Sequence, residues 1–236
     1  MQQTSATPAV PSGVGRLLVA GADAETFLQG QLTQDVRKIG AEPLVAGYCS
    51  AKGRLLAVME LRRGADGITA AIHRSVLDAT VKRLRMFVLR SKVTLTEINP
   101  LIAAEGDADW RRDRIARGVP TIFAATSDHF VPQMCNLDAL GGISFDKGCY
   151  TGQEVVARLH YLGQAKRRMF RARLDADANP GDSIIDATNP SQAAGEVVDA
   201  IGGEALVVLQ LAHADADLRL RGADGAKLSS LTRLTE

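Results

Sequence analysis

The character of the sequence changes near Gln164, and this change limits the folds available to the chain. Before it, apolar-periodic stretches of strand length and helix length alternate; after it, short apolar runs are separated by turns rich in Gly, Asp, Asn and Pro. Regularly spaced short strands are typical of an antiparallel barrel. The sequence therefore predicts an α+β domain at residues 14–164 and a C-terminal antiparallel β-barrel at residues 165–236, after a flexible N-terminal tail at residues 1–13.

The first part shows its elements most clearly at residues 74–90, where Leu77, Val81, Leu84 and Val88 share one helical face and charged residues lie elsewhere. Strands are expected at residues 16–20, 48–60 (with a break at 52–53), 68–73 and 93–98, with a hairpin turn at 64–67. Further helices are expected after Asp23, which is interpreted as an N-cap, and at 110–117. Another is expected from the 147–154 loop to about 161, ended by Gly163. In the second part, short strands are expected at 168–174, 183–185, 195–198, 205–211 and 218–220.

Composition excludes several classes of protein. The formal net charge of +1 argues against general attraction to nucleic acid or to anionic membranes. No run approaches 18 apolar residues, so no membrane span is expected, and the polar N-terminus reads as neither a signal nor a transit peptide. Three widely spaced cysteines (Cys49, Cys135 and Cys149) without a C-x-x-C pair predict a reducing compartment, the cytoplasm, and no self-sufficient metal site.

The densest group of unusual residues is the stretch 147–154, Lys-Gly-Cys-Tyr-Thr-Gly-Gln-Glu. Glycines allow positive φ or close approach of a ligand, and the helix that follows directs unpaired N–H groups toward the loop. Cys149 lies two residues from Lys147 and close to this helix start, which favours a reactive thiolate. The stretch therefore predicts a ligand-binding loop with a functional cysteine.

Several roles stay open for these residues. Cys149 could serve as a nucleophile, a redox contact or a transient cluster ligand, whereas Cys49 and Cys135 are interpreted as packing residues. His160 follows Cys149 by eleven residues with a helix between them, so no Cys–His pair is predicted. A glutamate in the first helical turn, as at Glu154, is favoured by the helix dipole alone.

The segment 130–170, FVPQMCNLDALGGISFDKGCYTGQEVVARLHYLGQAKRRMF, resembles the folate-binding protein family named for bacterial YgfZ and its mitochondrial relatives. Residues 27–35 and 114–120 resemble two further elements of that family. The signature of the family is K-G-C-[FY]-x-G-Q-E, and its fixed positions are filled by Lys147, Gly148, Cys149, Tyr150, Gly152, Gln153 and Glu154.

The resemblance implies the aminomethyltransferase (T-protein) folate-binding fold and a tetrahydrofolate-binding accessory protein for iron–sulfur cluster assembly or repair, which indirectly supports tRNA modification. Its implied partners are folate and iron–sulfur assembly proteins or cluster-containing enzymes. The alternative is a folate-dependent one-carbon (aminomethyl) transferase, so the resemblance leaves open whether the protein is an enzyme. A third hypothesis is a scaffold that binds a partner through the barrel.

By the same resemblance, Cys149 and Lys147 are the catalytic candidates, and the pterin ring stacks on Trp110 or Tyr150. The remaining folate-binding candidates are Gly148, Gly152, Gln153, Glu154, Gln31 and Arg158. The chain departs from the family pattern twice. Only eleven residues separate Ile98 from Trp110, which predicts a shortened middle subdomain, and Ala116 replaces a glutamate of T-proteins that suits the pterin edge.

A basic run opens the predicted barrel, with Lys166, Arg167, Arg168, Arg171 and Arg173. Such a run is usually a solvated strand face; the alternatives are attraction to the glutamyl carboxylates of folate, to an acidic protein or to RNA. Aromatic residues are 4% of the chain and do not interleave with this run, which argues against direct nucleic-acid binding.

Overall fold

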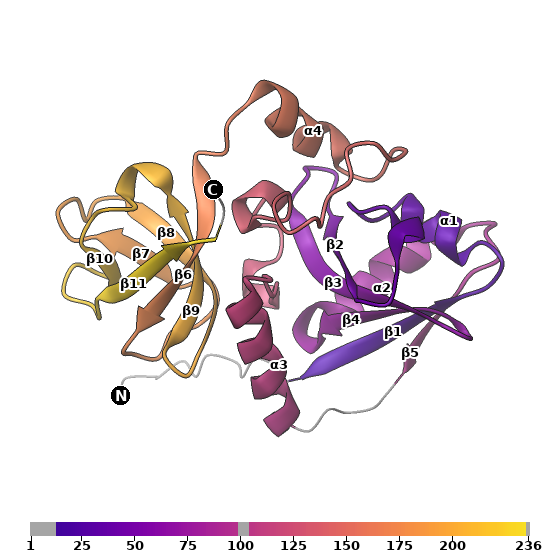
Figure 1. Ribbon diagram of the computed structural model, residues 1–236, viewed down its shortest axis with the longest axis horizontal. Helices are drawn as coiled ribbons and strands as arrows, with labels where there is room; N and C mark the ends of the chain where they lie inside the picture. The colour runs from indigo at the N-terminus through magenta and orange to yellow at the C-terminus, as the bar shows by residue number, and fades with distance from the viewer. Residues whose placement is uncertain (1–12, 99–103, 235–236) are drawn as a thin grey trace, which may run out of the picture.

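The computed structural model describes residues 13–98 and 104–234 and contains two antiparallel sheets at opposite ends of the molecule (Figure 1). The helices α3 (Ala104–Arg117) and α4 (Gln153–Leu162) lie between these sheets. Apart from Gly13, the expected N-terminal tail lies outside the described residues, and so does part of the short stretch before Trp110.

The first sheet has five strands in the order β2-β3-β4-β1-β5, and all neighbours run antiparallel. Its strands are β1 (Val14–Ala20), β2 (Leu44–Cys49), β3 (Leu55–Gly64), β4 (Gly67–His73) and β5 (Thr94–Ile98). The predicted hairpin joins β3 to β4, with Gly64 opposite Gly67. Strand β2 begins at Leu44 rather than at Tyr48, because its earlier residues also pair with β3.

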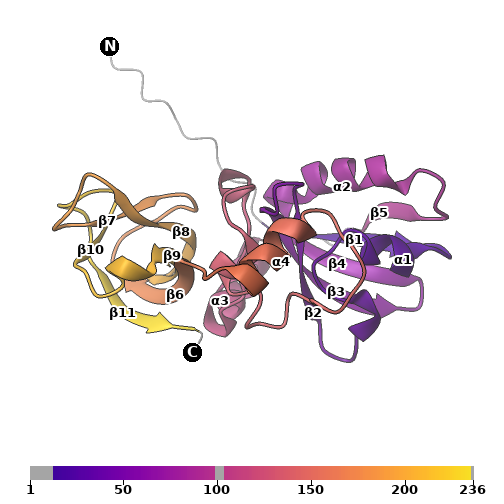
Figure 2. The same cartoon turned by 90° about the horizontal axis from the view of Figure 1, so that it is seen from above.

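One face of this sheet is covered by α2 (Arg74–Val88), the helix expected from the apolar periodicity (Figure 2). Leu77, Val81 and Leu84 are buried there against strand residues such as Leu17 and Ile72. Burial of one apolar stripe against a sheet is the main source of stability for such a helix. The opposite face of the sheet is therefore left for other contacts.

The connection from β1 to β2 contains α1 (Ala24–Gln29) and the short 3₁₀ helix η1 (Val36–Lys38). Asp23 precedes α1 as expected, but its carboxylate does not cap the helix. Instead it accepts a hydrogen bond of 2.7 Å from the backbone N–H of Lys92. This tertiary contact ties the start of α1 to the segment before β5.

The second sheet has six strands in the order β10-β7-β8-β9-β6-β11. They are β6 (Arg167–Leu174), β7 (Ser183–Asp186), β8 (Ala193–Ile201), β9 (Glu204–Gln210), β10 (Leu218–Leu220) and β11 (Leu228–Arg233). A bridge between Arg219 and Lys227, the residue before β11, brings β10 and β11 together, so the sheet closes into a barrel. Phe170 and Leu174 lie in the barrel core, as their alternation with arginines predicts. Strand β11 was not expected, because it contains few apolar residues.

A third core joins the two sheets. It combines residues of β3, α3, β6 and β9 with the irregular segment that holds the short helices η2 (Ala124–Thr126) and η3 (Pro132–Cys135). Arg111 of α3 donates to Asp199 of β8 from Nε at 3.0 Å, and the Asp199 side chain is 1% exposed. Helix α3 is therefore anchored to the barrel by a buried ion pair as well as by apolar contacts.

The proposed domain boundary near Gln164 falls between α4 and β6, in the chain that crosses from the first part to the barrel (Figure 1). The last short helix, η4 (Leu211–His213), follows β9. None of the helices in the described ranges is long and apolar enough to cross a membrane.

Candidate functional site

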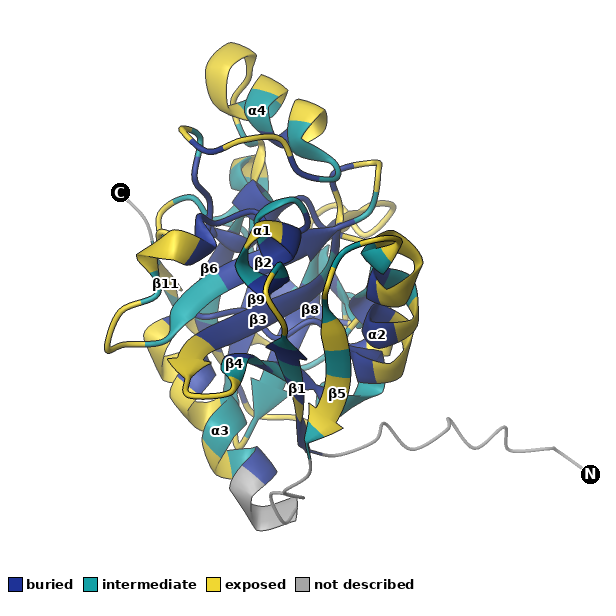
Figure 3. Ribbon diagram, turned by 90° about the vertical axis from the view of Figure 1, so that its right-hand side faces the viewer, coloured by how far each residue is buried: buried dark blue, intermediate teal, exposed yellow. Residues whose placement is uncertain are grey.

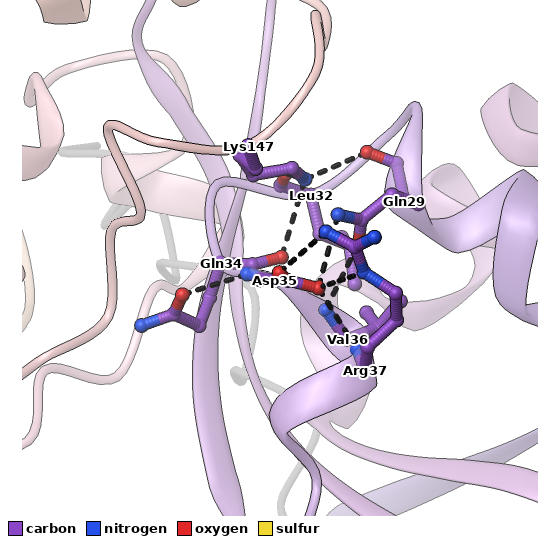
Figure 4. A network of polar contacts seen from close by, with 7 residues as sticks. All are labelled: Gln29, Leu32, Gln34, Asp35, Val36, Arg37 and Lys147. Atoms are coloured by element: carbon purple, nitrogen blue, oxygen red, sulfur yellow. Dashed lines mark hydrogen bonds and ion pairs between the residues drawn. The ribbon is translucent and has the colours of Figure 1, made fainter.

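The 147–154 loop lies against the connection between α1 and β2, and Lys147 makes the principal contact (Figure 4). Its ammonium donates to the backbone carbonyls of Gln29 (2.6 Å), Leu32 (2.6 Å) and Gln34 (3.2 Å). An ammonium has three donors, so these carbonyls account for all of them. Burial lowers the pKa of Lys147 to about 8, against the opposing charge of Asp35.

This arrangement bears on the expected link between Lys147 and Cys149. Because the three ammonium hydrogens are directed at carbonyl oxygens, none is left to donate to a thiolate. The geometry thus supports a positioning role for Lys147, which holds the loop against the residue 29–34 segment. Activation of Cys149 by this lysine stays a prediction.

The partner segment is itself held by side chains around Asp35 (Figure 4). The Asp35 carboxylate accepts hydrogen bonds from Arg37 at 2.9 Å (Nε) and 2.7 Å (a terminal nitrogen), and from Gln29 Nε2 at 3.0 Å. The Arg37 bond in particular holds the pKa of Asp35 well below its usual range. Gln34 donates from its amide to the carbonyl of Gly141. The surface that receives Lys147 is therefore already ordered.

The loop is also seated on the turn between β2 and β3, and glycines make this contact feasible. Gly152 has φ 82°, and a Cβ there would lie 2.4 Å from the carbonyl oxygen of Ser50. Gly53 has φ 69°, and a Cβ there would lie 2.6 Å from Cβ of Val155. Both positions therefore require glycine. At Gly148, by contrast, an added Cβ would meet nothing within 4 Å.

Tyr150 and Gln153 stabilise the interior of the loop. Tyr150 is buried, with its ring centroid 5.1 Å from Lys147 Nζ, and burial raises the pKa of its phenol. The side-chain oxygen of Gln153 accepts a hydrogen bond of 3.2 Å from the backbone N–H of Tyr150. The structure thus brings these three predicted site residues together as parts of one folded loop.

The remaining predicted residues of this region face solvent. Cys149 is exposed and free, and Glu154 and Arg158 are exposed on α4. Figure 3 shows much of α4 in the colour of exposed residues. His160 stacks on Phe145, with ring centroids 3.7 Å apart and an interplanar angle of 12°. This packing agrees with the expectation that His160 is not the partner of Cys149.

Among the predicted site residues, Gln31 has a buried polar atom without a partner, which suggests a ligand near the 147–154 loop. It is 9% exposed, and its side-chain oxygen has no hydrogen-bond partner among the residues that the structure describes. A buried polar atom without a partner costs free energy. A donor group on a ligand would satisfy it.

Trp110 lies elsewhere, in a groove of about 460 Å³ between α3 and the sheet face that α2 does not cover. The strand residues in this groove include Arg16, Glu60, Arg62 and Thr69. None of the residues 147–154 is among those that line it. The structure therefore does not bring Trp110 together with Tyr150 or Cys149.

The register of the sheet explains the groove. Ala71 pairs with Glu60 on one side and with Arg16 on the other, and Thr69 pairs with Arg62. Residues opposite each other across antiparallel strands project from the same face. Arg16, Glu60 and Arg62 thus form a charged surface beneath α3, although they lie far apart in the sequence.

Helix α3 is joined to this surface by charges. Arg117 donates to Glu60 at 2.6 Å, and the guanidinium of Arg114 lies 3.4 Å from the same carboxylate. Arg114 is fully buried, and its guanidinium carbon lies 4.5 Å from the centroid of the Trp110 ring. Burial lowers the pKa of Arg114 to about 10, whereas Glu60 opposes the shift. The indole of Trp110 therefore packs against the buried guanidinium of Arg114 and also lines the groove.

Several groove residues were not anticipated from the sequence: Arg16, Glu60, Arg62, Asp113 and Arg117. The only sequence signal was the alternation Glu60-Leu61-Arg62, polar residues at period two in an expected strand. Ala116, the position of the missing T-protein glutamate, lines a different crevice between α3 and the barrel, where its carbonyl accepts from Arg171 at 3.2 Å.

Comparisons with known proteins agree with this architecture. Residues 166–231 match the family model described as the CAF17 C-terminal beta-barrel domain. Proteins named tRNA-modifying protein YgfZ are similar to the chain: that of Enterobacter sp. (strain 638) is 31% identical over 218 residues, covering 64% of this chain and 67% of the relative. That of Escherichia coli (strain K12 / DH10B) is 30% identical with the same coverage.

Among solved structures, the glycine cleavage system aminomethyltransferase T from Bartonella henselae superposes with a TM-score of 0.58 at 12% identity, over 94% of this chain and 83% of that one. This likeness shows the fold. The α+β aminomethyltransferase fold with a C-terminal antiparallel barrel, predicted from the sequence, is thereby confirmed. The chain belongs to the YgfZ family.

Proposed function

We propose that this protein binds a reduced folate, tetrahydrofolate, in the Trp110 groove and acts as an accessory protein in the assembly or repair of iron–sulfur clusters. Through cluster-containing enzymes it would support tRNA modification, the activity in the names of its relatives. The observation that carries the proposal is the groove itself, because it combines an indole, acidic groups and arginines in about 460 Å³. Ligand sites typically have volumes of about 300–1,000 Å³.

The residues of the groove fit the chemistry of a folate. A pterin is flat and carries N–H donors along one edge; Trp110 offers a flat surface, and Glu60 and Asp113 offer carboxylate acceptors. These carboxylates supply an acidic partner although Ala116 does not. The glutamyl tail of a folate is anionic, and Arg16 and Arg62 form no ion pair among the described residues. We therefore assign the pterin to the Trp110 end and the tail to these arginines.

Cys149 would take a separate role in this proposal. Its exposed thiol stands on a loop that Lys147 and Gly152 hold in place, so a partner protein can reach it. We propose that Cys149 faces a delivered cluster or the cluster enzyme, with Lys147 as the residue that positions the loop. We further propose that the protein acts in a reducing compartment, the cytoplasm, and its three free cysteines support this location.

Aminomethyl transfer is not the function we propose. The relatives that are about 30% identical are named as tRNA-modifying proteins, whereas the aminomethyltransferase likeness rests on 12% identity and concerns the fold alone. Direct binding of nucleic acid is not part of the proposal either, because two of the four arginines of β6 have acidic partners: Arg168 bonds to Asp138 and Arg173 to Glu204.

The test is a titration with tetrahydrofolate under anaerobic conditions, followed by calorimetry and by the fluorescence of Trp110, the only tryptophan. Saturable quenching is expected, and Trp110→Ala should weaken binding by about tenfold in calorimetry, near the upper end of aromatic stacking energies. Absence of saturable binding, or unchanged affinity in Trp110→Ala, would contradict the proposed site.

The cellular part of the proposal has its own experiment. The protein is expressed in an Escherichia coli strain that lacks its own YgfZ relative, and the modified nucleosides of its tRNA are measured by mass spectrometry. We expect the wild-type protein to restore modification and Cys149→Ala to restore less. Failure of the wild-type protein to restore it, at normal expression, would contradict the accessory role while leaving folate binding intact.

A further inference from the structure

A second cavity lies on the other side of the first sheet, between α2 and the β2–β3 hairpin. Its volume is about 300 Å³, and most of its wall is apolar, including Leu56, Val76 and Met86. The polar side chains that border it include Tyr48 and Arg83. None of these residues contributes to the Trp110 groove, so this is a separate site.

An irregularity in the sheet opens this cavity. Tyr48 pairs with Ala57, but Cys49 pairs with Leu55, so Leu56 is an additional residue in β3. Such a bulge changes which side chains face each side of the sheet. As a result Leu56 packs against the α2-side core, next to Tyr48, whereas Leu55 belongs to the core that joins the two sheets. Bulges of this kind are often found beside functional sites.

Two hydrogen-bond donors border this cavity without a well-aligned protein acceptor. Tyr48 is 0% exposed, and its hydroxyl makes no well-aligned hydrogen bond among the described residues, although the Arg83 guanidinium lies close enough to interact with it. Nε of Arg83 is buried and equally lacks such a bond within the described ranges. Native proteins pair the great majority of buried polar atoms. Burial raises the pKa of Tyr48 to about 12, and the nearby Arg83 guanidinium opposes this increase, so the phenol stays protonated and able to donate.

We propose that this cavity binds a small monocarboxylate with an apolar body, its carboxylate accepting hydrogen bonds from Tyr48 and Arg83. A carboxylate carries only acceptors and the charge that complements a guanidinium. The apolar wall formed by Leu56, Val76 and Met86 suits an alkyl chain or a ring. Lys82 also borders the cavity and adds positive charge.

The size of the cavity limits the ligand. At about 30 Å³ for each water-sized group, a volume of about 300 Å³ accommodates roughly ten non-hydrogen atoms. Octanoate, which has this size, is therefore a suitable probe. 1-Octanol has the same number of carbon atoms without the charge, so it separates recognition of the carboxylate from simple burial of apolar surface.

Binding is measured by calorimetry on the full-length protein with octanoate and with 1-octanol. We expect saturable binding of octanoate and at least tenfold weaker binding of 1-octanol. Arg83→Met should weaken octanoate binding at least tenfold. Its matched control is Arg85→Met, which removes the same charge from the same helix at a residue outside the cavity and should change affinity less than twofold.

Tyr48→Phe provides a second, independent variant. It should weaken octanoate binding about tenfold without lowering the melting temperature of the free protein, because the hydroxyl that it removes makes no well-aligned hydrogen bond among the described residues. Arg16→Met, in the Trp110 groove, should leave octanoate binding unchanged.

Three results would overturn the proposal. They are no saturable binding of octanoate to the wild-type protein, equal affinity of Arg83→Met and Arg85→Met for octanoate, and binding of 1-octanol as tight as that of octanoate. None of these results would affect the proposal that tetrahydrofolate binds in the Trp110 groove, because that site is tested with variants of other residues.

Discussion

The 147–154 loop and the Trp110 groove are built in opposite ways. The loop is one continuous stretch of sequence. Its glutamine bonds to the backbone of the loop itself, and its lysine bonds to backbone carbonyls of the residue 29–34 segment. The groove is assembled from separate elements, and two of its arginines, Arg16 and Arg62, have no ion pair among the described residues. A dense sequence motif therefore marks a loop that is firmly anchored to the rest of the protein, whereas the groups free to bind a ligand come from residues with no common motif.

This comparison separates two kinds of residue that a signature alone does not distinguish. Lys147 and Gly152 hold a loop in place, while Cys149 is the member of the signature that presents a reactive group to solvent. Changes to the first kind should alter stability, and changes to the second kind should alter chemistry. The following predictions test this division.

The largest effect is expected from Lys147→Met. It removes three hydrogen bonds of a charged donor and leaves carbonyl oxygens without partners, which should lower the free energy of unfolding by about 4 kcal/mol. Urea denaturation measures this loss. Lys166→Met, at an exposed lysine, is the control and should stay within about 0.5 kcal/mol of wild type. If both variants are equally stable, Lys147 does not anchor the loop; a slower Cys149 alkylation in Lys147→Met would instead support activation of the thiol.

A slightly smaller loss of stability is expected when the pH is lowered, because of the titration of His73. Burial, together with Arg111 and Arg114, lowers the pKa of His73 to about 4, from an ordinary value of 6.5. Between these values the unfolded chain binds a proton that the folded protein does not, so stability falls as the pH decreases from 6.5 to 4. The shift corresponds to roughly 3 kcal/mol.

The measurement for His73 is the free energy of unfolding across that pH range in wild type and in His73→Asn. Asparagine can still accept the hydrogen bond that His73 Nδ1 receives from the backbone N–H of Ser75. The variant should lose less stability than wild type on acidification. Parallel pH curves for the two proteins would show that His73 does not titrate as stated.

The third effect concerns the cysteines. Cys49 and Cys135 are buried, and burial raises the pKa of both thiols, that of Cys49 to about 12, whereas Cys149 is exposed. Since the thiolate is the reactive form, Cys149 should be alkylated at least about 100-fold faster than the other two in the native protein. Mass spectrometry of iodoacetamide-treated protein gives the ratio, and similar rates at all three sites would remove the distinction between packing and functional cysteines.

The smallest effect is expected from Arg16→Met and Arg62→Met in the groove. Each removes an exposed charge, so each should weaken tetrahydrofolate binding only about threefold to fivefold, within the range of exposed ionic contacts. Arg63→Met is the matched control on β3, outside the groove, where Arg63 pairs with Glu25. Calorimetry compares the three variants, and an equal loss in Arg63→Met would assign the effect to net charge rather than to the groove.

Local patterns were enough to predict the elements whose signals are short-range. The apolar stripe of α2, the turn at residues 64–67 and the end of α4 at Gly163 are confirmed. Strand β11 and the early start of β2 were missed, because pairing with neighbouring strands extends segments that have little alternation of their own. Asp23 was interpreted as a helix cap, but it bonds to Lys92 instead.

What the sequence determined by itself is the set of local structures and the family signature, since these depend on residues within a few positions of one another. The tertiary structure alone decided that Glu60 and Arg16 share a face beneath Trp110, and that Lys147 reaches the carbonyls before β2. Strand register and helix docking are set by long-range packing, and a shift of one residue would turn each side chain to the other face of the sheet. The functional groups of this protein are therefore positioned by contacts that no local pattern contains.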